Sequence, residues 1–363
     1  MRTIGDAFQS AMHDEQNNFL LLRLLAASLV IYGHSFWMAG KHCAQCFDIS
    51  QAWFHYRYSG ELGVHVFFAV SGFLVFASFD RSRDLSRFIT ARALRIFPGL
   101  ILCVVVMVLV VGPLMTTEPL YQYFASPKTL EYLWSNGSLY RMVGDLPGVF
   151  ASNPSPNIVN GPLWTLPIES RFYLLVAVLG AMGCSSKRWT ANATVIAVWA
   201  MTLAVPEFVP MIGSDPTYHR LGAFFAAGSL LYINRYAITL DARILGLLII
   251  CAICSYQSTT FDFACGVVLT YAVFWIAFAR KIAVPAFVRD YSYGIYLYGW
   301  PVGQILVQKF PTLGPYSLCA CTLAITWPIA AASWFLVEKP CLTLRGRRNA
   351  KSKDVGVEVA AAR

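Results

Sequence analysis

Charged residues are scarce in this sequence. Only 13% of its 363 residues are Asp, Glu, Lys or Arg, whereas 57% are hydrophobic, and the mean hydropathy is +0.55. Because soluble domains carry about a quarter charged residues, this composition excludes an ordinary soluble protein and favours one that crosses a membrane several times. The 28 basic residues exceed the 19 acidic ones, but they form no basic face or stripe, so the excess does not indicate nucleic acid as a partner.

Several other signals are absent. Residues 1–18 are polar and the apolar run after them is long enough to stay in a bilayer, so no cleavable signal peptide is expected. No internal repeat is visible, which argues against a transporter built from inverted halves. No hydrolase-like domain follows the last apolar run, so determinants for a substrate outside the cytoplasm are expected in the outer loops.

The ten cysteines lie mostly in apolar runs, where packing as small hydrophobic residues is their ordinary role. Only Cys43 and Cys46, in KHCAQC, are expected to be exposed. With His42 and His55 nearby they resemble a zinc pattern weakly, so no metal site is predicted. Outside the cytoplasm a disulfide or a pair of free thiols is favoured.

The apolar runs predict an all-α integral membrane protein with about ten transmembrane helices. We expect a cytoplasmic N-terminal segment at 1–18, a transmembrane domain at 19–340, and a basic, disordered tail at 341–363. The ten spans are placed near 19–38, 62–80, 96–115, 163–183, 191–208, 219–233, 242–258, 261–280, 292–309 and 316–337.

The loops between these runs predict the orientation. Basic clusters follow the second, fourth, eighth and tenth spans, and they fall on one side if the N-terminus shares it. By the positive-inside rule that side is the cytoplasm, so both termini are expected there. Residues 39–61 and 116–160 then form outer loops, and the second, rich in Pro, Asn and Gly, is expected to be an irregular cap.

Two polar residues interrupt the first span, LLRLLAASLVIYGHSF. Arg23 and His34 are eleven helical steps apart, so they share a face at a separation of about 16 Å along the axis. One interpretation is an arginine that extends to the interface and a satisfied interior histidine. The other is a polar face that looks into a cavity, because charged side chains in a bilayer are costly.

Further polar residues are predicted at the outer half of the membrane. Glu169 and Arg220 lie in the fourth and sixth spans, and His65 lies at the outer end of the second. We expect His34, His65, Glu169 and Arg220 to share one outward-facing pocket. A histidine with a carboxylate partner is the minimal general base for deprotonating a hydroxyl.

These residues lie in motifs that resemble a known family, the membrane-bound acyltransferase 3 family of bacterial glycan O-acyltransferases. RLLAASLVIYGH is similar to its Arg-ten-residues-His motif, and GVHVFFAVSGFLV, RALRIFP, GPLWTLPIESRFYLL, HRLGAFFAAGSLLY, SYGIYLYGWPV and WFLVEKP resemble further motifs in the same order. The resemblance implies ten spans and transfer of an acyl group, most often acetyl, from acetyl-CoA to a sugar hydroxyl outside the cytoplasmic membrane.

The resemblance also implies roles for residues. His34 would be the catalytic histidine, with Arg23 as its partner and Glu169 as the functional carboxylate. Arg92 and Arg95 would be cytoplasmic arginines associated with the donor. Family members often have an acidic residue at the position of His65 and many have His where this chain has Gly299, which removes one candidate base.

The chemistry of the reaction suits these residue types. Guanidinium groups bind phosphates well, although Arg92 and Arg95 are also explained by topology alone. We expect His34 to act as general base in direct transfer, supported by Glu169. An acyl-histidine intermediate stays open, and Ser71 is a less favoured nucleophile because it lies outside a G-x-S-x-G motif and small residues commonly serve helix packing.

Substrate contacts are predicted at low specificity for His65, Arg220 and Trp164. Outer aromatic residues such as Trp164 stack on sugars in one interpretation and form an interfacial belt in the other. The acceptor is expected to be an extracytoplasmic or lipid-linked glycan: lipopolysaccharide O-antigen, exopolysaccharide and lipochitooligosaccharide all fit. The enzyme would lie in the bacterial inner membrane. The alternatives are a proton-coupled transporter or flippase of a lipid-linked sugar, and a sensor or scaffold without turnover.

Overall fold

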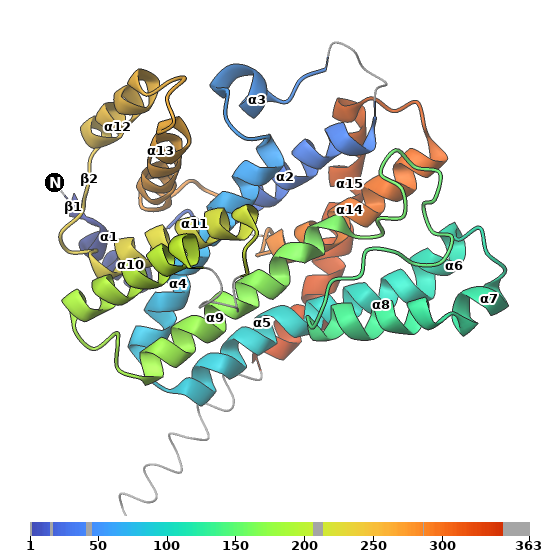
Figure 1. Cartoon of the computed structure of the whole chain (residues 1–363), viewed down its shortest axis with the longest axis horizontal. Helices are drawn as coiled ribbons and strands as arrows, with labels where there is room; N and C mark the ends of the chain where they lie inside the picture. Colours follow the sequence, from blue (N-terminus) through green and yellow to red (C-terminus); the bar gives the residue numbers. More distant parts are fainter. Residues whose placement is uncertain (1, 15–16, 41–45, 206–212, 286, 344–363) are drawn as a thin grey trace, which may run out of the picture.

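The fold is almost entirely helical. The computed structural model describes residues 2–14, 17–40, 46–205, 213–285 and 287–343, and within them the only strands are β1 (Arg2–Thr3) and β2 (Thr239–Leu240), paired antiparallel. The prediction of an all-α chain is therefore confirmed apart from this short pair (Figure 1).

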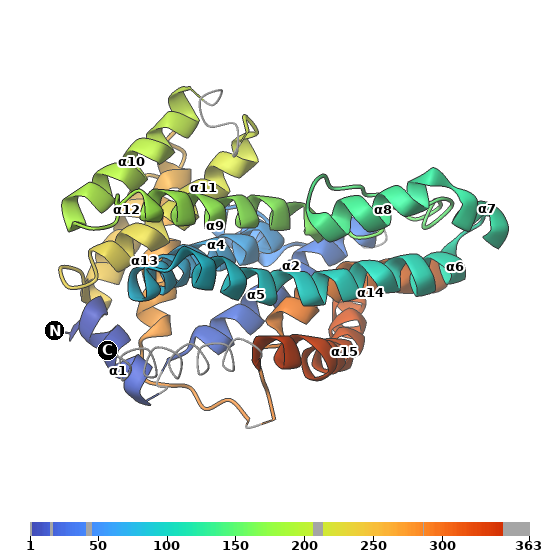
Figure 2. The same cartoon turned by 90° about the horizontal axis from the view of Figure 1, so that it is seen from below.

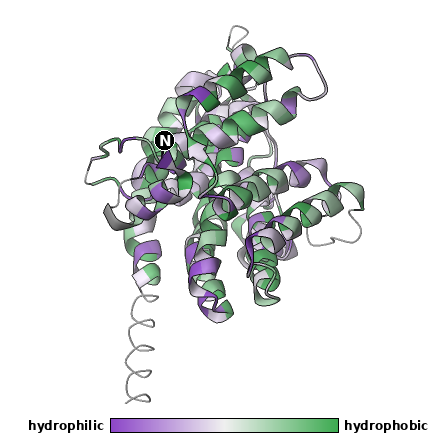
Figure 3. Ribbon diagram, turned by 90° about the vertical axis from the view of Figure 1, so that its left-hand side faces the viewer, coloured by the Kyte–Doolittle hydropathy of each residue, from purple (hydrophilic) through white to green (hydrophobic). Residues whose placement is uncertain are grey.

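Each of the ten predicted spans is occupied by a helix. In chain order these helices are α2 (Phe19–Met38), α4 (Ser59–Ser82), α5 (Leu85–Val106), α9 (Thr165–Ala181), α10 (Arg188–Ala204), α11 (Pro216–Ile233), α12 (Ala242–Cys254), α13 (Phe261–Ala277), α14 (Ser292–Lys309) and α15 (Pro315–Ser333). Hydrophobic residues cover most of their ribbon, with hydrophilic residues in patches (Figure 3).

Not all of these helices have the length and composition that a crossing requires. In the described part of the chain, five stretches do: Phe19–Met38, Ser59–Ser82, Leu85–Met115, Gly161–Ala181 and Pro315–Thr343. The helices α12 and α13 are apolar but shorter. The chain is thus a helical protein with several helices suited to a membrane.

The third span is a single long helix that contains a π-turn. The α5 helix continues through the π-helical turn Met107–Val111 into α6 (Gly112–Met115). The hydroxyl of Tyr123 donates to the carbonyl of Val108 at 2.9 Å, and a Cβ on Gly112 would lie 1.9 Å from that hydroxyl. The widened turn and the missing side chain together make room for the buried tyrosine.

The prediction of an irregular cap at 116–160 is wrong for its first half. This segment contains α7 (Leu120–Ala125) and α8 (Pro127–Ser138), and α8 lies alongside α5 (Figures 1 and 2). Pro127 occupies the first turn of α8, where a missing N–H costs nothing. The buried ring of Tyr132 then gives the helix an apolar contact with the rest of the molecule. Proline here starts a helix and does not mark a loop.

The polar N-terminal segment is folded onto the bundle. Helix α1 (Ile4–Asp14) buries Ile4, Ala7, Phe8 and Ala11, which recur at the spacing of one helical face. The Phe8 ring packs edge-on against Phe73 of α4 at 5.3 Å. The predicted disordered tail lies outside the described residues from position 344 onward.

Helix α4 is central to the packing because it contacts both α2 and α11 along much of its length. Its contact with α11 depends on glycine. A Cβ on Gly228 would lie 2.0 Å from the carbonyl oxygen of Ala69, and one on Gly72 would lie 2.0 Å from that of Phe225. Small residues let helix backbones approach closely in membrane proteins.

We predict that Gly228→Ala destabilises the protein, because the new methyl group would overlap backbone that cannot move without separating the helices. The expected loss is about 1–3 kcal/mol in the free energy of unfolding, as for other overpacked cores. The matched control is Gly246→Ala in α12, where a Cβ meets nothing within 4 Å. Thermal unfolding of the purified proteins in detergent measures both, and equal midpoints would contradict this account of the seam.

Candidate active site

Polar side chains of α2, α4, α5, α9 and α14 converge on a cavity of about 130 Å³. We call it the arginine cavity because three guanidinium groups line it. Its polar lining residues are Arg23, Ser71, Arg92, Arg95, Thr165, Glu169, Tyr173, Ser292, Tyr293 and Tyr296. The predicted donor arginines thus lie together with Arg23 and Glu169.

One carboxylate links two of these arginines. Oδ2 of Asp290, just before α14, lies 2.8 Å from Nη2 of Arg95 and 3.1 Å from Nη2 of Arg23. Its other oxygen accepts a hydrogen bond from the Ser292 hydroxyl at 2.6 Å. Asp290 therefore joins α2 and α5 to the start of α14.

Burial alone would raise the pKa of Asp290, but the guanidinium groups of Arg23 and Arg95 outweigh that effect and hold its pKa at about 2. The carboxylate is therefore ionised throughout the neutral range. Since a carboxylate with a lowered pKa stabilises the fold above its unfolded pKa, this contribution is complete at neutral pH and is lost only in strong acid.

Arg92 differs from the other two arginines. Nη2 donates to the Ser78 hydroxyl at 3.4 Å, and the guanidinium lies 5.7 Å from the centre of the Tyr173 ring. Within the described residues, no carboxylate forms an ion pair with Arg92. Its charge is therefore available to an anion that enters the cavity.

Glu169 is bound within the same cavity. Its Oε1 accepts hydrogen bonds from the hydroxyl of Ser71, at 3.1 Å, and from that of Tyr173. Ser71 therefore presents its hydroxyl to the cavity, while the neighbouring Gly72 makes the close helix contact. The carboxylate thus has two neutral donors and no histidine partner.

A second cavity, of about 540 Å³, contains His34. We call it the histidine cavity, and its lining includes Trp37, Tyr58, Glu61, Asn160, Trp164, Thr217, Arg220, Tyr296 and Trp300. The His34 ring packs edge-on against Trp300 at 4.9 Å, and the Tyr58 hydroxyl lies 3.5 Å from its Nε2. No described carboxylate lies within ion-pair distance of this ring. An imidazole in such surroundings suits a neutral base.

The acidic residue of the histidine cavity is Glu61, which reasoning from the sequence did not identify. Its Oε1 lies 3.2 Å from Nε of Arg220 and 3.6 Å from Nε2 of His65. The His65 ring stacks on Phe224 at 4.1 Å and does not line the cavity. His65 therefore lies behind Glu61, and Glu61 and Arg220 present the charges to the cavity.

The prediction of one pocket shared by His34, His65, Glu169 and Arg220 is wrong. Glu169 lines the arginine cavity, and His65 lines neither of the two. The structure does bring together His34, Trp164 and Arg220. Glu169 consequently does not support the charged form of His34 in this arrangement.

Of the residues that the structure describes, only Val64 and Tyr296 line both cavities. The polar face predicted to run from Arg23 to His34 is therefore divided, with Arg23 on one side of this wall and His34 on the other. The Tyr296 hydroxyl donates to the carbonyl of Pro162 at 2.8 Å and lies 2.6 Å from the Thr165 hydroxyl. These contacts hold the ring across the boundary.

The glycine at position 299 is explained by packing. A Cβ at Gly299 would lie 2.6 Å from Cγ1 of Ile31 in α2. A histidine at this position would need Ile31 to move or to be smaller. In this chain the isoleucine fills that space, so α14 contributes no imidazole to the site.

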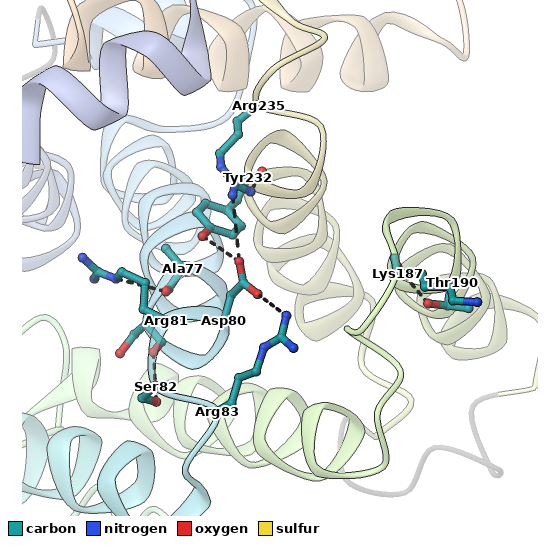
Figure 4. Close-up of polar contacts among 10 residues, drawn as sticks. Ala77, Asp80, Arg81, Ser82, Arg83, Lys187, Thr190, Tyr232 and Arg235 are labelled. Atoms are coloured by element: carbon teal, nitrogen blue, oxygen red, sulfur yellow. Dashed lines mark hydrogen bonds and ion pairs between the residues drawn. The ribbon is translucent and has the colours of Figure 1, made fainter.

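The basic residues at the end of α4 are partly paired. Asp80 lies 3.4 Å from Arg83 and 3.9 Å from Arg235, and it accepts a hydrogen bond from Tyr232 at 3.0 Å. Figure 4 shows Tyr232 of α11 and Arg235, which follows that helix, pointing toward Asp80, with Lys187 farther away. These contacts attach α4 to α11, so this cluster has a packing role as well as a topological one.

No metal centre is formed by the residues that the structure describes, since no group of three or more His, Cys, Asp or Glu side chains is close enough. Cys46 is disulfide-bonded, whereas His42 and Cys43 lie outside the described residues.

Both missed carboxylates had a signal in the sequence. Asp290 lies two residues before the predicted span at 292–309. It is an acidic residue close to a span, in a chain where Arg23, Arg92 and Arg95 need a counter-charge. Glu61 lies four residues before His65, one helical turn away. Buried charges are paired, so each unpaired arginine predicts a carboxylate, although not which one.

Comparison with known proteins gives consistent matches over nearly the whole chain. The model of an acyltransferase domain family matches residues 17–335. An O-acetyl transferase of Shigella phage Sf6 is 26% identical over 348 aligned positions, which cover 92% of this chain and 97% of that protein. Nodulation protein 10 of Rhizobium leguminosarum bv. viciae is 30% identical over 364 positions, which cover 91% and 94%. No solved structure matches the chain significantly.

We predict that Asp290→Asn lowers the free energy of unfolding by up to about 3–5 kcal/mol, the cost for a fully buried pair, because it leaves two partly buried guanidinium groups without a counter-charge. The matched control is Asp145→Asn, which breaks an exposed 2.8 Å pair with Lys128 and is expected to cost less than about 1 kcal/mol. Thermal unfolding in detergent compares them. Similar small losses in both variants would show that Asp290 does not hold the cavity together.

Proposed function

Because the chain belongs to the acyltransferase 3 family and is an O-acyltransferase, we propose that it transfers an acetyl group from cytoplasmic acetyl-CoA to a hydroxyl of a glycan outside the cytoplasm. The observation that carries the proposal is the pair of adjoining cavities. One is lined by three arginines and the other by a histidine among aromatic rings.

The arginine cavity is proposed to receive the donor. Acetyl-CoA carries phosphates at one end and a thioester at the other, and guanidinium groups bind phosphate oxygens with charge-assisted hydrogen bonds. Arg92 has no carboxylate partner among the described residues, so it is the first candidate for this contact. Arg95 and Arg23 share Asp290, which fixes their positions and leaves them one net positive charge.

Glu169 then acts on the donor side. Its contacts with Ser71 and Tyr173 fix the surface beside Arg92 along which the pantetheine arm would lie. This role replaces the support of His34 that the sequence suggested. Arg23 is assigned to the same side through its ion pair with Asp290.

The histidine cavity is proposed to receive the acceptor. His34 takes the proton of the acceptor hydroxyl while the hydroxyl oxygen bonds to the thioester carbonyl carbon, the carbon–sulfur bond breaks, and the CoA sulfur leaves and is protonated. Trp37, Tyr58 and Trp164 offer flat apolar surfaces for sugar rings. Arg220 and Glu61 offer a donor and an acceptor for sugar hydroxyls.

The proposal includes an arrangement in the membrane. The helical bundle is embedded in the bacterial inner membrane, with the five long apolar stretches crossing it and with both termini and the basic loops in the cytoplasm. The arginine cavity then faces the side that holds acetyl-CoA, and the histidine cavity faces the side that holds the glycan.

We predict that His34→Ala lowers acetyl transfer by at least about 100-fold, because removal of a general base costs that much or more. The wild type and the variant are expressed in a glycan-producing bacterium, and base-labile acetyl groups on surface polysaccharides are measured by mass. His219→Gln is the matched control, since His219 lines neither cavity. Unchanged acetylation in a folded His34→Ala protein would overturn the assignment.

We also predict that Arg92→Ala weakens acetyl-CoA binding by about tenfold or more, as expected when one charge-assisted hydrogen bond is lost. Binding of radiolabelled acetyl-CoA to the purified protein measures this. Arg188→Ala serves as control, because Arg188 donates to Asn234 at 2.9 Å and lines neither cavity. Equal affinities in the two variants would remove Arg92 from the donor site.

A further inference from the structure

The two cavities share few lining residues. Val64 of α4 and Tyr296 of α14 are the described residues that line both, and all other lining residues belong to one cavity alone. Val64 is small and rigid, whereas the tyrosine side chain is long and can rotate. The passage between donor and acceptor therefore depends chiefly on where the Tyr296 ring lies.

That ring is held by its hydroxyl to the other side of the passage. The carbonyl of Pro162, in the 3₁₀ turn Gly161–Trp164, accepts its hydrogen bond at 2.8 Å, and the hydroxyl of Thr165, the first residue of α9, lies at 2.6 Å. Pro162 lines the histidine cavity and Thr165 lines the arginine cavity. The hydroxyl is thus fixed at the point where the two cavities adjoin, and Phe67 packs edge-on against the ring at 5.9 Å.

Two neutral hydrogen bonds and one ring contact are a weak restraint compared with the ion pairs around Asp290. Rotation of the side chain would release the hydroxyl without moving the backbone of α14 or α9. The arginines on one side and His34 on the other would keep their positions. The barrier can therefore change at less cost than the ion-paired part of the site.

We propose that Tyr296 is a positioning residue that separates the donor thioester from the acceptor side until both substrates are bound, and that it keeps water from the thioester. The inference rests on the proposed function and adds to it a residue and a task. Acetyl transfer then occurs beside Val64 and the Tyr296 ring, because these are the described residues that line both cavities.

The consequence is a competition between two oxygen nucleophiles. In transfer, the glycan hydroxyl oxygen bonds to the thioester carbonyl carbon, the carbon–sulfur bond breaks, and the sulfur leaves as the CoA thiol after it is protonated. In hydrolysis, a water oxygen takes the place of the hydroxyl and the products are acetate and CoA. Exclusion of water from a closed site suppresses the second reaction.

The test measures acetyl-CoA hydrolysis without acceptor, using the purified full-length protein in nanodiscs and radiolabelled acetyl-CoA. Tyr296→Ala is expected to raise acetate release by about tenfold over the wild type, because the barrier to water is removed. Transfer to surface glycan in cells is expected to fall at the same time. The ratio of hydrolysis to transfer therefore rises, which a loss of folded protein alone would not produce.

Tyr298→Ala is the matched control. Tyr298 is two residues away on α14, is also buried, and lines neither cavity. An unchanged ratio of hydrolysis to transfer in folded Tyr296→Ala, or an equal rise in Tyr298→Ala, would overturn the inference. If Tyr296→Ala does not fold, Val64→Ala decides: increased hydrolysis supports the barrier and unchanged hydrolysis refutes it. Failure of the proposed function itself is distinct, because the wild type would then transfer no acetyl group.

Discussion

The geometry of this site depends on how the protein accommodates three guanidinium groups inside an apolar bundle. Asp290 supplies the counter-charge for two of them, and through them it joins α2 and α5 to the start of α14. Buried ions are tolerated only when they are paired, so the positions of these helices and the pairing of the charges support each other. The third group, Arg92, is left without a carboxylate among the described residues. The same network thus gives the cavity its shape and its surplus of positive charge.

The division into two cavities gives each half of the proposed reaction its own chemistry. Charge dominates on the side of Arg23, Arg92 and Arg95, as phosphate binding requires. Aromatic rings and an imidazole dominate around His34, and a single ion pair, between Glu61 and Arg220, supplies the charge there. No described carboxylate forms an ion pair with His34, and an imidazole in its neutral form can accept a proton. The absence of His at position 299 fits this arrangement, because Ile31 occupies the space that a larger side chain would need.

Reasoning from the sequence identified the helices and several site residues, because both follow from the free-energy cost of placing polar groups in a bilayer. Long apolar runs can only be buried as helices in a bilayer, and a charge such as Arg23 within such a run demands a partner. What the sequence could not supply were partners distant along the chain, such as Asp290, and depth in the membrane. Glu169 was predicted to share a pocket with His34, but it lines the arginine cavity, whereas His34 lines the histidine cavity. The boundary at Val64 and Tyr296 could not be predicted from the sequence either, since it depends on contacts between Tyr296 of α14 and the residues Pro162 and Thr165.

The wall at Val64 and Tyr296 has a consequence beyond the reaction. A protein with water-filled hollows opening toward both faces of an energised bilayer is a conduit for protons and small ions unless something insulates one hollow from the other. Val64 and the Tyr296 ring, which is held by its hydroxyl and packs against Phe67, lie where the two cavities adjoin and would interrupt a continuous file of water molecules there. In the proposed arrangement, a thioester site faces one compartment and a sugar site faces the other while the electrochemical gradient across the membrane is preserved.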